Sequence, residues 1–239
     1  MQWTSEGLII GVRRHGETSV IAEVMVARHG RTLGLIRGGR SSKLAATLQP
    51  GNTVQLTWRA RLAEHLGTMT VEMIDARAAD LIADRLRLYA CQLLCDHLRL
   101  LPERDPHDRL LGLAVDALDD GKELIALGAE LARFELSLLD ELGFGLDLSA
   151  CAVTGQTDDL THVSPRTGRA VSREAAEPYR DRLLRLPAFL LDDTAPASLT
   201  DLADAFRLTS HFLHMHVWDA RQLEPPAMRD ALIGAVTAV

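Results

Sequence analysis

The stretch LIIGVRRHGETSVIAEVMVARHGRTLGL, residues 8–35, decides how the N-terminal part of the chain folds. Apolar residues alternate with other residues along three short segments, and turns containing Gly16 and Gly30 separate these segments. A period of two is typical of β-strands with one buried face, and glycine supplies the backbone conformations that tight turns need. The stretch therefore predicts three consecutive antiparallel strands.

Two further segments continue this pattern beyond residue 35. Apolar residues alternate over residues 54–58 and again over residues 69–73. A glycine-rich loop at residues 37–43 and a Pro-Gly turn at residues 49–52 separate them from the earlier strands. Five short antiparallel strands in one small segment indicate a partly open barrel, and the OB-fold is the common barrel of this size.

From about residue 78 the apolar spacing changes to three and four residues, which is typical of amphipathic helices. The first predicted helix ends at Leu101 because Pro102 and Pro106 follow. Further helices are expected at residues 108–118, 123–142, 198–223 and 227–236, with a mixed, turn-rich segment at 146–197. We therefore predict an α+β protein, with an OB-fold domain at residues 1–78 and an α-helical domain at residues 79–239.

Composition limits the environment in which this chain works. No apolar run approaches the roughly 18 to 20 residues that a membrane-spanning helix needs. The first residues carry no basic segment of the kind that opens a signal peptide. Three cysteines, Cys91, Cys95 and Cys151, cannot build a disulfide framework. We expect a cytoplasmic protein that has no membrane partner.

The charge of the chain is divided unevenly between its two parts. The overall net charge is −7, which by itself argues against binding to nucleic acid. Residues 1–79 contain ten Lys or Arg against six Asp or Glu, a net charge of +4, whereas the remaining 160 residues carry −11. This asymmetry indicates a polyanion-binding part joined to an acidic body, with chance as the alternative explanation.

The loop at residues 37–43 is the clearest candidate for contact with DNA. It holds three cations, two glycines and no acid, so both its side chains and its backbone can approach phosphates. A solvated hairpin tip is the alternative. On the neighbouring segment, Trp58 shares a face with the apolar residues that are expected to point into the core. The opposite face is polar and carries arginines, which favours electrostatic, weakly sequence-specific binding. The predicted DNA-binding residues are Arg31, Arg37, Arg40, Lys43, Arg59 and Arg61.

Other groups of reactive side chains are better explained without chemistry. Cys91 and Cys95 share a helical face, and we interpret them as buried thiols. His211, His214 and His216 lack the spacing of a zinc site, and we interpret them as core or interface residues. The chain contains no phosphate-binding loop, dinucleotide motif or nucleophile elbow. We predict no catalytic residue, no metal and no cofactor.

Several short motifs occur in a specific order and spacing along nearly the whole length of the chain. In the N-terminal part these are residues 7–10 (GLII), 16–21 (GETSVI), 29–31 (HGR), 37–43 (RGGRSSK) and 48–51 (LQPG). Further along they are residues 134–143 (FELSLLDELG), 163–172 (VSPRTGRAVS) and 186–187 (LP). Through the order and spacing of these motifs, the chain resembles the bacterial RecO family of recombination mediators.

This resemblance implies an N-terminal OB domain, a helical C-terminal domain and no catalysis of covalent chemistry. It implies binding to single- and double-stranded DNA and annealing of complementary strands. It also implies cooperation with RecR in loading RecA onto strands coated with single-strand-binding protein, whose C-terminal tail is a further expected partner. A pocket for that tail needs cations beside an apolar groove, such as Arg85, Arg99, Arg133 and Arg207.

The chain departs from the family pattern in the segment at residues 146–197. Many relatives carry two CxxC pairs there that bind zinc, whereas this chain has Cys151, Thr154, Ser172 and Ala175 at the four positions. One thiolate cannot hold a tetrahedral zinc ion, so we expect a zinc-finger-like insertion without metal. Two other functions stay open: a protein-only adaptor that docks partners through both parts, and a small-molecule enzyme with its site between the helices.

Overall fold

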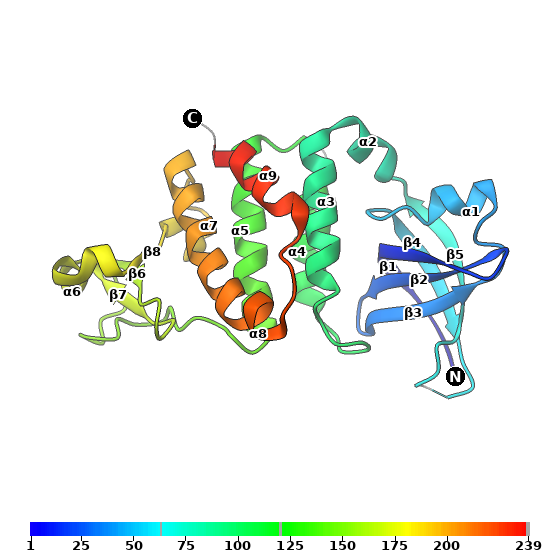
Figure 1. Cartoon of the computed structure of the whole chain (residues 1–239), viewed down its shortest axis with the longest axis horizontal. Helices are drawn as coiled ribbons and strands as arrows, with labels where there is room; N and C mark the ends of the chain where they lie inside the picture. Colours follow the sequence, from blue (N-terminus) through cyan, green and yellow to red (C-terminus); the bar gives the residue numbers. More distant parts are fainter. Residues whose placement is uncertain (63, 120, 238–239) are drawn as a thin grey trace. The chain divides into compact units, whose positions relative to one another are not determined.

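A computed structural model describes residues 1–62, 64–119 and 121–237. The chain divides into two compact units, Met1–Asp119 and Asp120–Val239. The first unit contains a barrel followed by three helices, and the second contains helices and a small sheet (Figure 1). The predicted domain boundary after residue 78 lies where the strands give way to helices, whereas the first compact unit continues through three helices.

The N-terminal strands form the five-stranded barrel that the sequence predicted, and this barrel is closed, with the strand order β1-β2-β3-β5-β4. The strands are β1 (Gln2–His15), β2 (Ser19–Val26), β3 (Gly30–Ile36), β4 (Thr53–Arg59) and β5 (Thr68–Asp75). A short helix, α1 (Ser42–Thr47), connects β3 to β4. All neighbouring strands are antiparallel except β3 and β5, which meet in parallel at the single pair Leu35 and Thr68.

Trp58 lies inside the barrel, as expected, whereas the expected inward direction of the leucines on β3 was wrong. Trp58 is 3% exposed, and its indole Nε1 donates to the carbonyl oxygens of Leu33 and Leu66, each at 3.2 Å. On β3 the alternating leucines Leu33 and Leu35 face outward, not into the core. The reason is space, because a Cβ at the inward-facing Gly34 would lie 2.7 Å from the Cβ of Met69.

Three helices complete the first unit: α2 (Ala78–Ala83), α3 (Arg85–Leu98) and α4 (Asp108–Leu118). The sequence predicted one uninterrupted helix before Pro102, and this was wrong. The helix breaks at Asp84, whose extended backbone allows its carboxylate to accept hydrogen bonds from the backbone N–H groups of Leu86 and Arg87. Asp84 therefore acts as the N-cap that starts α3.

The second unit is built mainly from α5 (Leu124–Glu141), α7 (Leu199–Leu213) and α9 (Ala227–Thr237). A π-helical turn (His214–Trp218) and α8 (Asp219–Arg221) extend α7. The mixed segment forms a sheet of order β7-β6-β8, from β6 (Leu160–Val163), β7 (Ala170–Ser172) and β8 (Leu184–Arg185). Next to this sheet lie α6 (Arg173–Ala176) and two 3-10 turns (Glu177–Arg182 and Ala188–Leu190). Among the described helices, none combines the length and apolar character that a bilayer crossing requires.

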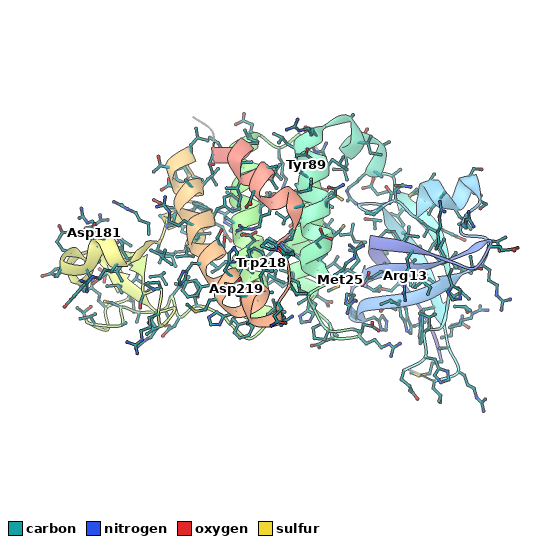
Figure 2. All side chains as sticks on the ribbon, viewed as in Figure 1. Arg13, Met25, Tyr89, Asp181, Trp218 and Asp219 are labelled. Atoms are coloured by element: carbon teal, nitrogen blue, oxygen red, sulfur yellow. The ribbon has the colours of Figure 1, made fainter. Side chains whose placement is uncertain are left out.

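A buried ion pair joins the three main helices of the second unit. Arg229 of α9 is 3% exposed, and its Nε and Nη2 each donate to the carboxylate of Glu135 on α5 at 2.7 Å. Thr209 of α7 donates to the same carboxylate at 2.6 Å, and Arg229 also donates to Ser210 at 2.8 Å. The guanidinium lies 5.2 Å from the ring of Trp218, which Figure 2 labels.

Candidate nucleic-acid interface

The outer wall of β1, β2 and β3 is divided into a covered part and an open part. In the covered part, Leu8, Ile10 and Met25 are at most 1% exposed although they lie outside the barrel core. The helices of the same unit bury them, since α3 packs against β1 and α4 packs against β2. The open part lies toward the other ends of these strands and contains the candidate surface.

An ion-pair network marks the border between the two parts, and it contains Arg31. Arg31 is half-buried, pairs with Glu23 at 2.5 Å and donates to the carbonyl oxygen of Leu101 at 2.9 Å. The same Glu23 pairs with Arg99 at 3.1 Å, so one carboxylate lies between two guanidinium groups. The charge of Arg31 is therefore compensated within the protein, which separates it from the other predicted DNA contacts.

The open part carries a row of residues that crosses four strands of the barrel wall beyond β1. Paired positions run from Arg13 through Ile21, Leu35 and Thr68 to Arg59. Adjacent strands lie about 4.8 Å apart, so this row spans about 19 Å along the wall. Arginines stand at its two ends, with apolar and hydroxyl side chains between them. Figure 2 labels Arg13 on the barrel.

A cleft of about 470 Å³ opens beside this row, where β3 and β5 separate beyond their single pair. Its walls include Leu35 and Arg37 from β3 and the loop after it, Leu44 from α1, and Thr68 and Thr70 from β5. An apolar floor, two hydroxyl groups and one cation at the edge provide contacts for bases and for phosphates.

The loop after β3 presents its cations from a fixed position. The side chain of Arg40 donates to the carbonyl oxygen of Glu17, and its backbone N–H donates to that of Thr18 at 3.2 Å. These bonds attach the loop to the turn between β1 and β2. The sequence predicted that Lys43 lies in a loop, but Lys43 is part of the helix α1. The helix places Lys43 one turn beyond Arg40 on a rigid element.

The outer face of β4 changes in charge along its length. Gln55 is paired with Glu6 on one side and Glu72 on the other. Two residues on, Thr57 is flanked by threonines of β1 and β5, and Arg59 then follows between Gln2 and Thr68. The predicted polar face is therefore basic only at the Arg59 end, and Arg61 extends that end into the next loop.

Most cations of the barrel have no acidic partner. Among the ten basic residues of the first 79, Arg31 and Arg77 form ion pairs in the described part of the chain. For the other eight, residues 1–62, 64–119 and 121–237 supply no ion pair. Unpaired cations are available to neutralise phosphates, and this releases the counterions condensed on a polyanion and so favours its binding. Five of the six predicted DNA-binding residues belong to this group: Arg37, Arg40, Lys43, Arg59 and Arg61.

The histidines that the sequence grouped together have separate structural partners. His211 bonds the carbonyl oxygen of Pro165 at 2.9 Å, and His214 pairs with Asp219 at 3.2 Å. His216 stacks on Phe144 with ring centroids 4.7 Å apart. No group of three potential metal ligands occurs within residues 1–62, 64–119 and 121–237. Each histidine therefore has a local packing or hydrogen-bonding role.

Cys151 lies where the resemblance placed one ligand of the missing zinc site. The backbone N–H and the hydroxyl of Ser172 both donate to its sulfur, at 3.3 and 3.4 Å. Burial raises the pKa of this thiol, but hydrogen bonds from Ser172 and Thr154 outweigh burial and lower the pKa to about 6. Three of the four ligand positions thus meet in space, joined by hydrogen bonds to one thiol. The two other cysteines, Cys91 and Cys95, are buried as expected.

The four arginines considered for a peptide pocket have local partners of different kinds. Arg85 lies over the ring of Tyr89, and Arg99 pairs with Glu23 and Asp96. In the second unit, Arg133 donates to the carbonyl oxygen of Phe189 and pairs with Asp193, and Arg207 pairs with Asp204. The described contacts bring no two of them together.

Sequence reasoning missed Arg13 and the two outward leucines of β3. Arg13 was counted in the charge of the N-terminal part but was not assigned to the surface, because its position beside Ile21 depends on strand pairing. The sequence did contain a signal for the direction in which the leucines face. Gly34 has no side chain, and this marks its own face of β3 as the one that lies close to other residues.

Comparison with known proteins gives a consistent result over both parts of the chain. Residues 1–77 match the family model "Recombination protein O N terminal", and residues 82–222 match "Recombination protein O C terminal". The chain is 51% identical over 240 residues to the "DNA repair protein RecO" of Brucella abortus (strain 2308), covering 99% of this chain and 96% of the relative. It is 52% identical over 240 residues to the protein of the same name from Mesorhizobium japonicum, covering 99% and 94%.

Proposed function

Because this chain belongs to the RecO family of DNA repair proteins, which are non-enzymatic recombination mediators, we propose that its barrel binds single- and double-stranded DNA. The contacts are made by a surface that we name the basic rim. It consists of Arg13, Arg37, Arg40, Lys43, Arg59 and Arg61. Arg31 is left out of the rim because Glu23 already neutralises it.

The observation that carries this proposal is the absence of acidic partners for the rim. Each of its six cations lacks an ion pair with any described acid, while Arg31 and Arg77 of the same barrel are paired. Arginines also stand at both ends of the row across the wall, and Arg37 lines the adjacent cleft. Phosphates would contact the rim, and unstacked bases would lie against Leu35 and its neighbours.

We further propose that the protein anneals complementary strands and, with RecR, helps to load RecA onto strands coated with single-strand-binding protein. Weak sequence specificity suits this role, because the rim contacts phosphates, which are the same in every sequence, and not the base edges that differ between sequences. The acidic C-terminal tail of single-strand-binding protein would bind elsewhere on the chain. Chromosomal DNA as substrate places this activity in the cytoplasm. None of these steps requires covalent chemistry.

A triple variant tests the DNA-binding surface. Replacing Arg37, Arg40 and Lys43 by alanine removes three phosphate contacts, and each contact contributes about 0.7 to the log–log salt slope for a single strand. The slope should therefore fall in magnitude by about 2, and affinity should drop similarly for all sequences. Mobility shift of labelled single strands at several salt concentrations measures both quantities.

A control variant with the same change in net charge distinguishes binding at this surface from a general electrostatic effect. Arg173, Arg180 and Arg207 are exposed on the second unit, and each pairs with a neighbouring acid. Their triple alanine variant changes the net charge by the same amount and should leave the salt slope unchanged. Equal slopes for the rim variant and the unmodified protein would remove the loop from the DNA site and favour the protein-only adaptor.

A further inference from the structure

A second feature of the barrel, a stack of aromatic rings, lies outside the basic rim. Trp3 of β1 stacks on His29, which follows β2, with ring centroids 3.9 Å apart and planes inclined by 10°. The other neighbour of Trp3 is its strand partner Trp58, at 5.7 Å and 19°. Trp58 is buried, whereas Trp3 and His29 are each half-buried. The stack therefore runs from the barrel core toward solvent.

A hollow of about 200 Å³ lies against this stack, with Trp3, His29 and Trp58 in its lining. At about 30 Å³ for each water molecule, it holds the equivalent of about seven waters. This is below the range of about 300–1,000 Å³ that drug-sized ligands occupy. The space suits one planar ring of pyrimidine size, and aromatic walls favour a ring that can stack.

Two arginines also line the hollow, and both hold an unusual backbone conformation. Arg28 has φ +62° and Arg104 has φ +63°, in the left-handed region that favours glycine. Each position thus carries a cation despite the backbone strain. Neither guanidinium forms an ion pair with a described residue. Asp108 accepts a hydrogen bond from the backbone N–H of Arg28 and lies outside the lining. The guanidinium of Arg104 donates to the backbone carbonyl oxygen of His65 at 2.9 Å.

We propose that this hollow binds one unpaired nucleobase against the Trp3–His29 stack, while Arg28 and Arg104 contact the neighbouring phosphates. The proposal rests on the DNA-binding function proposed above and adds a preference for single strands. A base within a duplex is already stacked and paired, so only an unpaired base can enter. Because every base has a π-face, binding here does not depend on sequence. The two cations favour a nucleotide over an apolar side chain of a protein partner.

The test compares two probes that differ only in their bases. One is a thymine strand, and the other is an abasic strand of the same length with the same phosphates. The intact protein should bind the thymine strand about five- to tenfold more tightly, at the lower end of what stacking one base contributes. His29→Ala should lower this ratio to what the bases gain against Leu35 and its neighbours, and His29→Phe should restore it. The salt slope should stay the same in both variants.

Further variants keep the proposal open to refutation if His29→Ala alters folding. Arg28→Gly relieves backbone strain and should fold normally, while it should lower the magnitude of the salt slope by about 0.7. His65→Ala is the matched control, because the side chain of this exposed histidine lies outside the lining of the hollow, and alanine keeps the backbone carbonyl that Arg104 contacts. Its ratio should equal that of the intact protein.

The possible outcomes distinguish a failure of the base site from a failure of the proposed DNA-binding function on which it rests. If the intact protein binds both strands equally well, DNA binding stands and the base site is wrong. The base site is also wrong if His29→Ala keeps the full preference for thymine, as a purely structural stack or a peptide-binding hollow would require. If neither strand binds at low salt, the proposed function fails and the base site fails with it.

Discussion

Replacing Arg229 by methionine should lower the free energy of unfolding by about 3–5 kcal/mol, because it leaves the buried carboxylate of Glu135 without its counter-charge. The carboxylate accepts hydrogen bonds from two nitrogens of Arg229 and from Thr209. Burial lowers the pKa of Arg229, but Glu135 outweighs burial and raises that pKa above its usual value. The variant loses both bonds from Arg229, and the neutral hydroxyl of Thr209 cannot supply the missing positive charge.

Urea unfolding followed by far-ultraviolet circular dichroism measures this change, because the ion pair joins three helices. The double variant Glu135→Leu with Arg229→Met removes both charges and should be much more stable than the sum of the single effects predicts. Arg207→Met is the control, since its exposed pair with Asp204 should contribute at most about 1 kcal/mol. A loss of less than about 1 kcal/mol for Arg229→Met, or additive single effects, would refute the reasoning.

Three further predictions address other parts of the chain. Replacing Thr154, Ser172 and Ala175 by cysteine should complete a four-thiolate site with Cys151 that binds one zinc ion. Competition with a chromogenic chelator measures this binding, and a variant that binds no zinc would contradict the inferred geometry. Gly34→Val should cost about 1–3 kcal/mol in thermal or urea unfolding, because its Cβ would meet Met69, and full stability would show that the wall has room. Arg31→Met should lower stability but leave the DNA salt slope unchanged, and a slope reduced in magnitude by about 0.7 would return Arg31 to the DNA site.

The sequence predicted the elements of this fold better than it predicted which way their side chains face. Alternation located all five strands of the barrel, since one buried face leaves a strong period-two pattern. The same pattern was misread on β3, where Leu33 and Leu35 face outward because glycine and threonine fit the crowded interior. Local pattern specifies a strand, but the size of its neighbours across the barrel decides its inner face.

The candidate site shows a similar limit. Loop composition identified Arg37, Arg40 and Lys43, which are all free of acidic partners in the described part of the chain. The predicted site also included Arg31, which lies outside that loop. Its partner Glu23 is eight residues away and becomes its neighbour through the pairing of β2 with β3. Trp3 was not assigned a role, because its stacking partner His29 is distant in the sequence and the two rings meet only in the folded chain.

The short strands of the second unit left almost no periodic signal. β7 has three residues and β8 has two, which is too few for alternation to be read. The break at Asp84 did have a signal, because aspartate is a preferred N-cap residue. The apolar spacing continues across that break, and the longer pattern concealed the cap.

The salt dependence of single-strand binding by the unmodified protein tests the central claim most directly. Six rim cations that each meet one phosphate give a log–log slope of about −4 for single-stranded DNA, and phosphate contacts of Arg28 and Arg104 would increase its magnitude to about 5.6. Mixed-sequence strands of one length should share this slope and differ little in affinity. A slope near zero, or no binding to strands at low salt, would contradict the assignment of the barrel as the surface that binds DNA.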